Sequence, residues 1–129
     1  MYRHTFAEID LDAITKNIKN TKELIGKDKK LLAVVKADAY GHGSVKVAKT
    51  ALAAGAEFLA VALAEEAVPL RESGIVCPIL ILGASNYAQK ELAVKLNIDM
   101  AVTDFSEVGE LASIAQKMGK KAKIHIKID

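Results

Sequence analysis

The sequence LLAVVKADAYGHG, residues 31–43, decides how the fold is interpreted. Residues 31–35 form an apolar run that is typical of a strand buried in a parallel sheet. Lys36 follows directly, and after it comes a short loop with a tyrosine and two glycines. A lysine at the end of an inner strand loses hydration, and one reason to keep it there is covalent catalysis on a carbonyl compound. A solvent-facing lysine that simply ends a strand explains the same pattern.

Apolar strand-like runs and amphipathic helical patterns alternate along the whole chain. The predicted strands are 31–35, 58–62, 79–82, 100–102 and 123–128. The predicted helices are 44–54, 64–73, 85–96 and 105–118, with Ser85 as the cap of the third and Asp104 or Ser106 as the cap of the fourth. An additional helix is expected before the first strand, capped by Asp10 or Asp12 and ending before Gly26, and residues 5–11 are compatible with a short strand. Pro69 should kink the second helix or delay its start.

Repeated strand–helix units imply an α/β fold with a parallel sheet and right-handed crossovers. An open doubly wound sheet and a (β/α)₈ barrel both fit. A complete barrel needs about 200 residues or more, whereas this chain has 129 residues and about five strands. We therefore expect residues 1–129 to be the N-terminal part of the barrel domain of a longer protein.

The composition excludes several classes of function. The net charge of +2 leaves no basic footprint for nucleic acid or for a membrane surface. The apolar runs are far shorter than the ~20 residues of a membrane helix, and the polar N-terminus is not a signal peptide. The single cysteine, Cys77, cannot form an internal disulfide, so a reducing cytoplasmic location is expected. Its neighbours favour a packing role at a strand entry over a nucleophile.

Strand parity places Lys36 on the same side as Leu32 and Val34. Lys36 would then lie on the inner side at the carboxyl end of its strand, where β/α enzymes have their catalytic residues.

The last strand alternates three isoleucines with polar residues. Ile124, Ile126 and Ile128 should pack on helices, so His125, Lys127 and Asp129 should face the other side. In a barrel that side is the interior, and a second inward lysine at 127 must be paired, neutralised or modified, for example as a carbamate. An edge strand with one wet face explains the same alternation.

No other group of residues in the sequence predicts a reactive site as specifically as Lys36 does. The Gly41-His42-Gly43 segment lacks the spacing of the dinucleotide and Walker A motifs. The histidines at 4, 42 and 125 are too scattered for a local metal motif, and there is no cysteine pair for zinc, so no metal site is expected. Glu65 and Glu66 are interpreted as first-turn residues that complement a helix dipole.

The segment 33–43 resembles the pyridoxal-phosphate signature of alanine racemases. The segments 7–14 and 78–83 resemble the N-terminal opening and third barrel strand of that family, and 127–129 resembles the start of its K-x-D-T-G-M-x-R segment. The resemblance covers nearly the whole chain. It implies a (β/α)₈ barrel followed by a mostly β domain, in a homodimer that racemises alanine and supplies D-alanine for peptidoglycan.

The same resemblance implies roles for particular residues. Lys36 would hold pyridoxal phosphate covalently and act as the base on the D-alanine face, and Tyr40 would hydrogen-bond the cofactor phosphate. Lys127 would be the lysine that is carbamylated in many members. The cofactor pocket would be lined by Val34, Leu80 and Leu82.

Racemisation needs two groups that flank the α-carbon. In the family the second is a tyrosine from the C-terminal domain of the partner subunit, and this chain has no match for it. We therefore expect residues 1–129 alone to be inactive. The alternatives are a serine or broad-spectrum racemase, another enzyme of the same fold type, such as a pyridoxal-phosphate homeostasis protein or group IV decarboxylase, and a non-catalytic β/α fragment.

Overall fold

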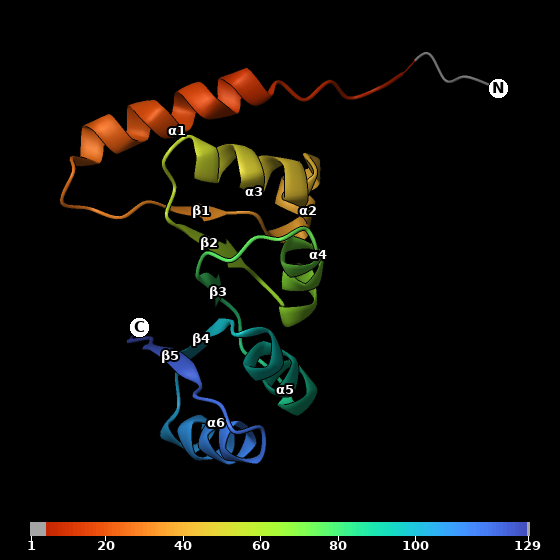
Figure 1. Ribbon diagram of the computed structural model, residues 1–129, viewed down its shortest axis with the longest axis vertical. Helices are drawn as coiled ribbons and strands as arrows, with labels where there is room; N and C mark the ends of the chain where they lie inside the picture. The colour runs from red at the N-terminus through yellow and green to blue at the C-terminus, as the bar shows by residue number, and fades with distance from the viewer. Residues whose placement is uncertain (1–4, 129) are drawn as a thin grey trace.

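The computed structural model describes residues 5–128 and shows one parallel sheet with helices along it (Figure 1). In chain order the elements are α1 (Leu11–Ile25), β1 (Leu32–Val34), α2 (Lys36–Gly41), α3 (Ser44–Ala53), β2 (Phe58–Val61), the 3₁₀ turn η1 (Ala64–Glu66), α4 (Ala67–Glu72), β3 (Ile79–Ile81), α5 (Tyr87–Leu96), β4 (Asp99–Val102), α6 (Phe105–Lys117) and β5 (Lys123–Ile126). His4 and Asp129 lie outside the described residues.

The five strands lie in the order β1-β2-β3-β4-β5, and every neighbouring pair is parallel. Each strand therefore lies beside the next one in the chain, with a crossover segment between them. This sequential order is that of a (β/α)₈ barrel and not that of a doubly wound sheet, in which the order reverses at a switch point. The predicted five-stranded N-terminal part of a barrel is confirmed.

The core lies between the sheet and the helices α3 to α6. Alternate residues of the central strands are fully buried on this side: Leu59, Val61, Ile79, Ile81 and Met100. Burying a leucine or isoleucine side chain stabilises a fold by roughly 1.5–3 kcal/mol. The helix α1 lies outside this layer and contacts α3 (Figure 1).

Several predicted boundaries need correction. Residues 5–10 do not form the short strand considered from the sequence. Asp10 caps α1 by accepting hydrogen bonds from the N–H groups of Asp12 (2.9 Å) and Ala13 (3.0 Å). Asn86, and not Ser85, caps α5, since its side chain accepts the Gln89 N–H at 3.0 Å. Asp104 is the cap of α6.

Pro69 delays a helix as predicted. The segment begins with the 3₁₀ turn η1, and α4 starts at Ala67, so that Pro69 falls in its first turn, where its missing N–H matters least.

Cys77 packs partly against the core, as expected for a strand entry. Burial raises the pKa of its thiol despite the nearby guanidinium of Arg71, which makes it a poor nucleophile at neutral pH.

Candidate functional site at the carboxyl edge of the sheet

The carboxyl ends of all five strands meet at one edge of the sheet, because the strands are parallel. Lys36 follows β1, Leu82 follows β3 and Lys127 follows β5. The lysine at the end of β1 and the lysine at the end of β5 therefore belong to the same edge, as predicted from the sequence alone.

The strand register defines the face of the sheet that would form a barrel interior. Residues paired across parallel strands share a face, and one row runs through Val34, Ala60, Leu80, Asp99 and Lys123. The row is apolar on β1 to β3 and charged on β4 and β5.

The predicted cofactor-lining residues lie on or beside this face. Val34 and Leu80 belong to the row, and Leu82 lies two residues beyond Leu80. Leu80 is buried, Val34 is half-buried, and Leu82 is 40% exposed at the edge. With Ala60 of β2, which lies between Val34 and Leu80 in the register, they form one apolar wall.

The segment after Lys36 has a conformation that the sequence did not predict. Ala37, Asp38, Ala39 and Tyr40 have φ between 49° and 56° and ψ between 37° and 50°, so α2 is a single left-handed turn. Each non-glycine residue in this conformation costs about 1–2 kcal/mol relative to the right-handed form. A turn this strained persists only where the surroundings hold it.

Specific contacts hold the turn. The Asp38 carboxylate accepts the Ser44 N–H at 2.7 Å, and the Ala39 N–H donates to the Val35 carbonyl at 3.0 Å. The Ala39 side chain is 4% exposed and belongs to the core. Tyr40 is 60% exposed, so its ring is presented at the edge of the sheet. Lys36 is half-buried at the start of the turn.

Glu66 links this turn to the next β/α loop. Its Oε1 accepts the Ala37 N–H at 2.7 Å, and its Oε2 accepts the N–H groups of Ala62 (2.7 Å) and Leu63 (3.2 Å). Burial raises the pKa of Glu66, but the three N–H donors and the charge of Lys36 outweigh it, so that the net pKa lies below its usual range. Glu66 thus does more than complement a helix dipole, because it also binds the main chain at Ala37. The one local signal for the hydrogen bonds of Glu66 was the capping-box spacing, because Glu66 stands three residues after Leu63, the residue before the 3₁₀ turn.

Asp99 and His125 form a polar pair on the inner face. The Nε2 of His125 lies 3.2 Å from the Oδ2 of Asp99, and Asp99 is only 7% exposed. The other oxygen, Oδ1, is buried and has no hydrogen-bond partner. The alternation in the sequence predicted the face of His125 correctly, whereas no pattern indicated Asp99, an acidic residue at the start of an apolar strand.

The alternation in β5 is confirmed for residues 124–126. Ile124 and Ile126 are on the α6 side and line surface hollows together with Val108. The expected packing of the three isoleucines on helices is wrong for Ile126 and Ile128, which are 76% and 94% exposed because β5 is the edge strand of the sheet. Lys127 is exposed, and its N–H donates to the Val102 carbonyl at 2.9 Å, which extends the pairing of β5 with β4.

This set of groups fits one wall of a pyridoxal-phosphate site. A half-buried primary amine suits an aldehyde, an exposed tyrosine hydroxyl suits a phosphate, and the apolar wall suits an aromatic ring. No group of three or more His, Cys, Asp or Glu side chains within residues 5–128 could hold a metal ion. No helix in the same part of the chain is long and apolar enough to cross a membrane.

The sequential parallel strands are those of the N-terminal part of a β/α barrel, with polar and charged side chains after the strands. The family model described as "Alanine racemase, N-terminal domain" matches residues 9–129. The chain belongs to the alanine racemase family.

Individual relatives agree with this assignment. The chain is 46% identical over 127 residues to alanine racemase 2 of Caldanaerobacter subterraneus, an alignment that covers 98% of this chain and 33% of the relative. It is 54% identical over 101 residues to the alanine racemase of Geobacillus stearothermophilus, covering 78% of this chain and 26% of that one. The chain thus spans about a third of the length of the first of these curated relatives.

Solved structures show the same fold. Alanine racemase from Bacillus anthracis with bound L-Ala-P superposes with a TM-score of 0.89 at 43% identity, over 98% of this chain and 32% of that chain. Alanine racemase of Clostridium difficile 630 in complex with cycloserine gives a TM-score of 0.84 at 41% identity, over 92% of this chain and 31% of that chain.

Proposed function

We propose that the full-length protein containing this chain interconverts L-alanine and D-alanine with pyridoxal phosphate held by Lys36. One observation carries the proposal: in a chain of the alanine racemase family, Lys36 follows the first strand at the carboxyl edge of the sheet. Relatives that are themselves named alanine racemase support alanine as the substrate.

The proposed chemistry divides between the cofactor and the chain. Pyridoxal phosphate, when bound, delocalises the electron pair left on the α-carbon once its proton is removed. Lys36 would hold the cofactor through Nζ, which condenses with the aldehyde and releases water. The amino group of the substrate would then displace Nζ, and the amine released in this way would take or return the α-proton on one face of the amino acid. Tyr40 would donate a hydrogen bond from its hydroxyl to the phosphate.

The apolar wall would pack against the cofactor ring and exclude water from the reacting carbon. It consists of Val34, Ala60, Leu80 and Leu82. Excluding water strengthens the electrostatic interactions within the site.

Lys127 is proposed as the carbamylated lysine. Its place after β5, on the side of His125 and across the edge from Lys36, supports that role. A carbamate would convert a cation into an anion and give the inner face a negative charge next to its basic residues.

No second acid–base group stands opposite Lys36 among the site residues described above. We propose that the second group comes from another part of the full-length protein, in a homodimer. The chain of residues 1–129 alone is accordingly expected to lack racemase activity, and a cytoplasmic location remains a prediction.

The test is racemisation by the purified full-length protein. Interconversion of L- and D-alanine is followed by chiral chromatography, with Lys36→Ala as the site variant and Lys46→Ala, an exposed lysine of α3, as the matched control. We expect activity in the wild type and the control and none in Lys36→Ala. A preference for serine or for many amino acids over alanine would replace the substrate assignment, and inactivity on all of them would contradict the proposed function.

A further inference from the structure

The side chain of Glu66 joins two consecutive β/α loops through main-chain hydrogen bonds. Its Oε2 accepts two N–H groups of the loop after β2, and its Oε1 accepts the Ala37 N–H, 29 residues away in the turn after β1. One carboxylate therefore satisfies three backbone donors that would otherwise lie near the edge of the sheet without a partner in the fold.

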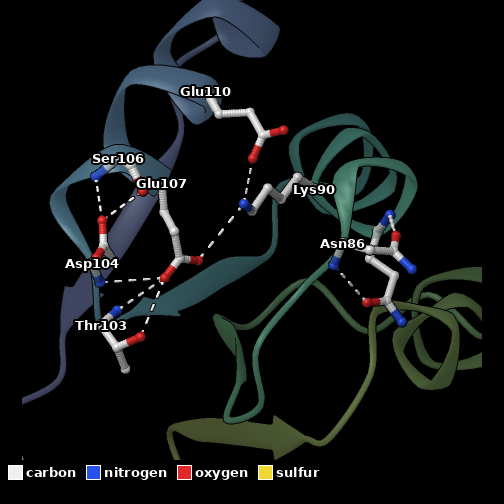
Figure 2. A network of polar contacts seen from close by, with 8 residues as sticks. Asn86, Lys90, Thr103, Asp104, Ser106, Glu107 and Glu110 are labelled. Carbon is white, nitrogen blue, oxygen red and sulfur yellow. Dashed lines mark hydrogen bonds and ion pairs between the residues drawn. The ribbon is translucent and has the colours of Figure 1, made fainter.

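Two other β/α units have a side chain at the equivalent position. Glu107 Oε1 accepts the N–H groups of Thr103 (3.2 Å) and Asp104 (3.3 Å) after β4, and its other oxygen lies 3.7 Å from Lys90 Nζ (Figure 2).

The third example is Gln89 after β3. Its side-chain oxygen accepts the Asn86 N–H at 3.1 Å, and its amide nitrogen donates to Glu65 at 3.2 Å. Each of these side chains closes its own loop and reaches back to the preceding unit. Only Glu66 reaches back to a main-chain amide, and that amide belongs to the residue after Lys36.

The Ala37 N–H belongs to the peptide group that joins Lys36 to Ala37, so its position affects the direction in which the Lys36 side chain leaves the backbone. The peptide group between Lys36 and Ala37 is planar, so a hydrogen bond to this N–H fixes its plane and the backbone from which the lysine side chain departs. Ala37 is also the first of the four left-handed residues, and hence the point at which the strand changes to a left-handed turn.

We propose that Glu66 is a positioning residue, which holds the Lys36–Ala37 peptide in the conformation that aims the lysine amine at its carbonyl partner. This inference rests on the proposed function. The positive charge of Lys36 helps to lower the pKa of Glu66, as expected if the two side chains lie close together. Glu66 does not itself contact the reacting atoms in this role.

The variant Glu66→Gln separates this role from simple packing. The glutamine amide keeps one acceptor oxygen but places an NH₂ donor where the second acceptor stood, so one of the two loops must be released. The matched control is Glu65→Gln, which alters the neighbouring exposed carboxylate that contacts Gln89. Glu66→Asp retains the charge but is one methylene shorter and cannot reach both loops.

Two measurements on the full-length protein test the proposal. The first is the rate at which pyridoxal phosphate, added to the cofactor-free protein and trapped with borohydride, labels Lys36, as quantified by mass spectrometry. The second is the rate of hydrogen exchange of the peptide containing residues 37–41. We expect labelling about 10-fold slower in Glu66→Gln, the factor that corresponds to losing roughly 1.4 kcal/mol of a charge-assisted hydrogen bond, with faster exchange in the turn.

Glu66→Asp should also be slowed, and Glu65→Gln should remain within about twofold of the wild type. Labelling and exchange in Glu66→Gln that match those of Glu65→Gln, while the wild type labels normally at Lys36, would overturn the positioning role alone. A wild-type protein that is not labelled at Lys36 would instead overturn the proposed function. If Glu66→Gln does not fold, Glu66→Asp decides: normal labelling there would overturn the positioning role.

Discussion

The imidazole of His125 on β5 lies 3.2 Å from the carboxylate of Asp99 on β4, on the face opposite the helices. Asp99 is almost fully buried, and its second oxygen has no hydrogen-bond partner. Burying a carboxylate costs free energy, and here the hydrogen bond to His125 is the contact that offsets this cost. The stability of the fold should therefore be sensitive to the loss of His125.

This pair predicts a measurable energetic coupling. In a double-mutant cycle with Asp99→Ala and His125→Ala, urea unfolding should give a coupling energy of about 1 kcal/mol or more. Pairing Asp99→Ala with Lys46→Ala on α3 should give additive effects. Additivity of the first pair would show that the histidine contact does not stabilise the carboxylate.

The left-handed turn predicts an unusual response to glycine. Ala37 is exposed with φ 49°, a conformation that glycine adopts without strain, so Ala37→Gly should be neutral or stabilising by up to about 1 kcal/mol. Ala112 is exposed within the right-handed helix α6, and Ala112→Gly should destabilise by about 1 kcal/mol. Equal destabilisation by both substitutions, measured by urea unfolding, would mean that the turn is not left-handed in solution.

The buried ammonium of Lys90 predicts an asymmetric effect of removing its partners. Its side chain is 7% exposed between Glu107 and Glu110, which are 19% and 38% exposed (Figure 2). Lys90→Met leaves carboxylates that water can reach and should change the unfolding free energy by less than about 1 kcal/mol. The double variant Glu107→Gln, Glu110→Gln leaves a buried charge and should cost about 3 kcal/mol. The reverse order in urea unfolding would contradict this assignment of the burial penalty to the lysine.

Glu66 predicts a pH-dependent contribution to stability. Its pKa in the folded protein lies below the ordinary value of 4.5, because hydrogen bonds and Lys36 outweigh burial. A group with a lowered folded pKa stabilises the fold fully above its unfolded pKa and loses that contribution as the pH falls through the folded pKa. The difference in unfolding free energy between wild type and Glu66→Gln should therefore be constant from about pH 7 to about pH 6 and shrink below about pH 4.5. A difference that grows on acidification would contradict the assignment.

Periodicity predicted most of the fold, because each signal is local. Apolar runs in the sequence indicated the five strands, and helical patterns, most of which end at a glycine, indicated the helices α3 to α6. The predicted bounds agree with those of the structure within a few residues. Strand parity placed His125 correctly because it requires only the alternation of side chains along one strand, whereas the face assigned to Lys36, which lies beyond the end of β1, stays a prediction.

Features that depend on distant partners escaped the sequence analysis. The turn Ala37–Tyr40 contains no glycine, so nothing in its composition indicates a left-handed conformation that Glu66 and the buried Ala39 help to hold. Glu66 was interpreted by its place in a helix start because Ala37 lies 29 residues before it. Asp99 was missed because the strand was predicted to begin one residue later, and its acidic side chain is paired only through β5.

Lys36 is proposed to be the lysine that holds pyridoxal phosphate. The most direct test of this role is to add pyridoxal phosphate to the full-length protein, reduce with borohydride and map the modified residue by mass spectrometry. We expect one stoichiometric adduct on Lys36, absent in Lys36→Ala and retained in Lys46→Ala. An adduct on a different lysine, or none on the folded protein, would contradict it.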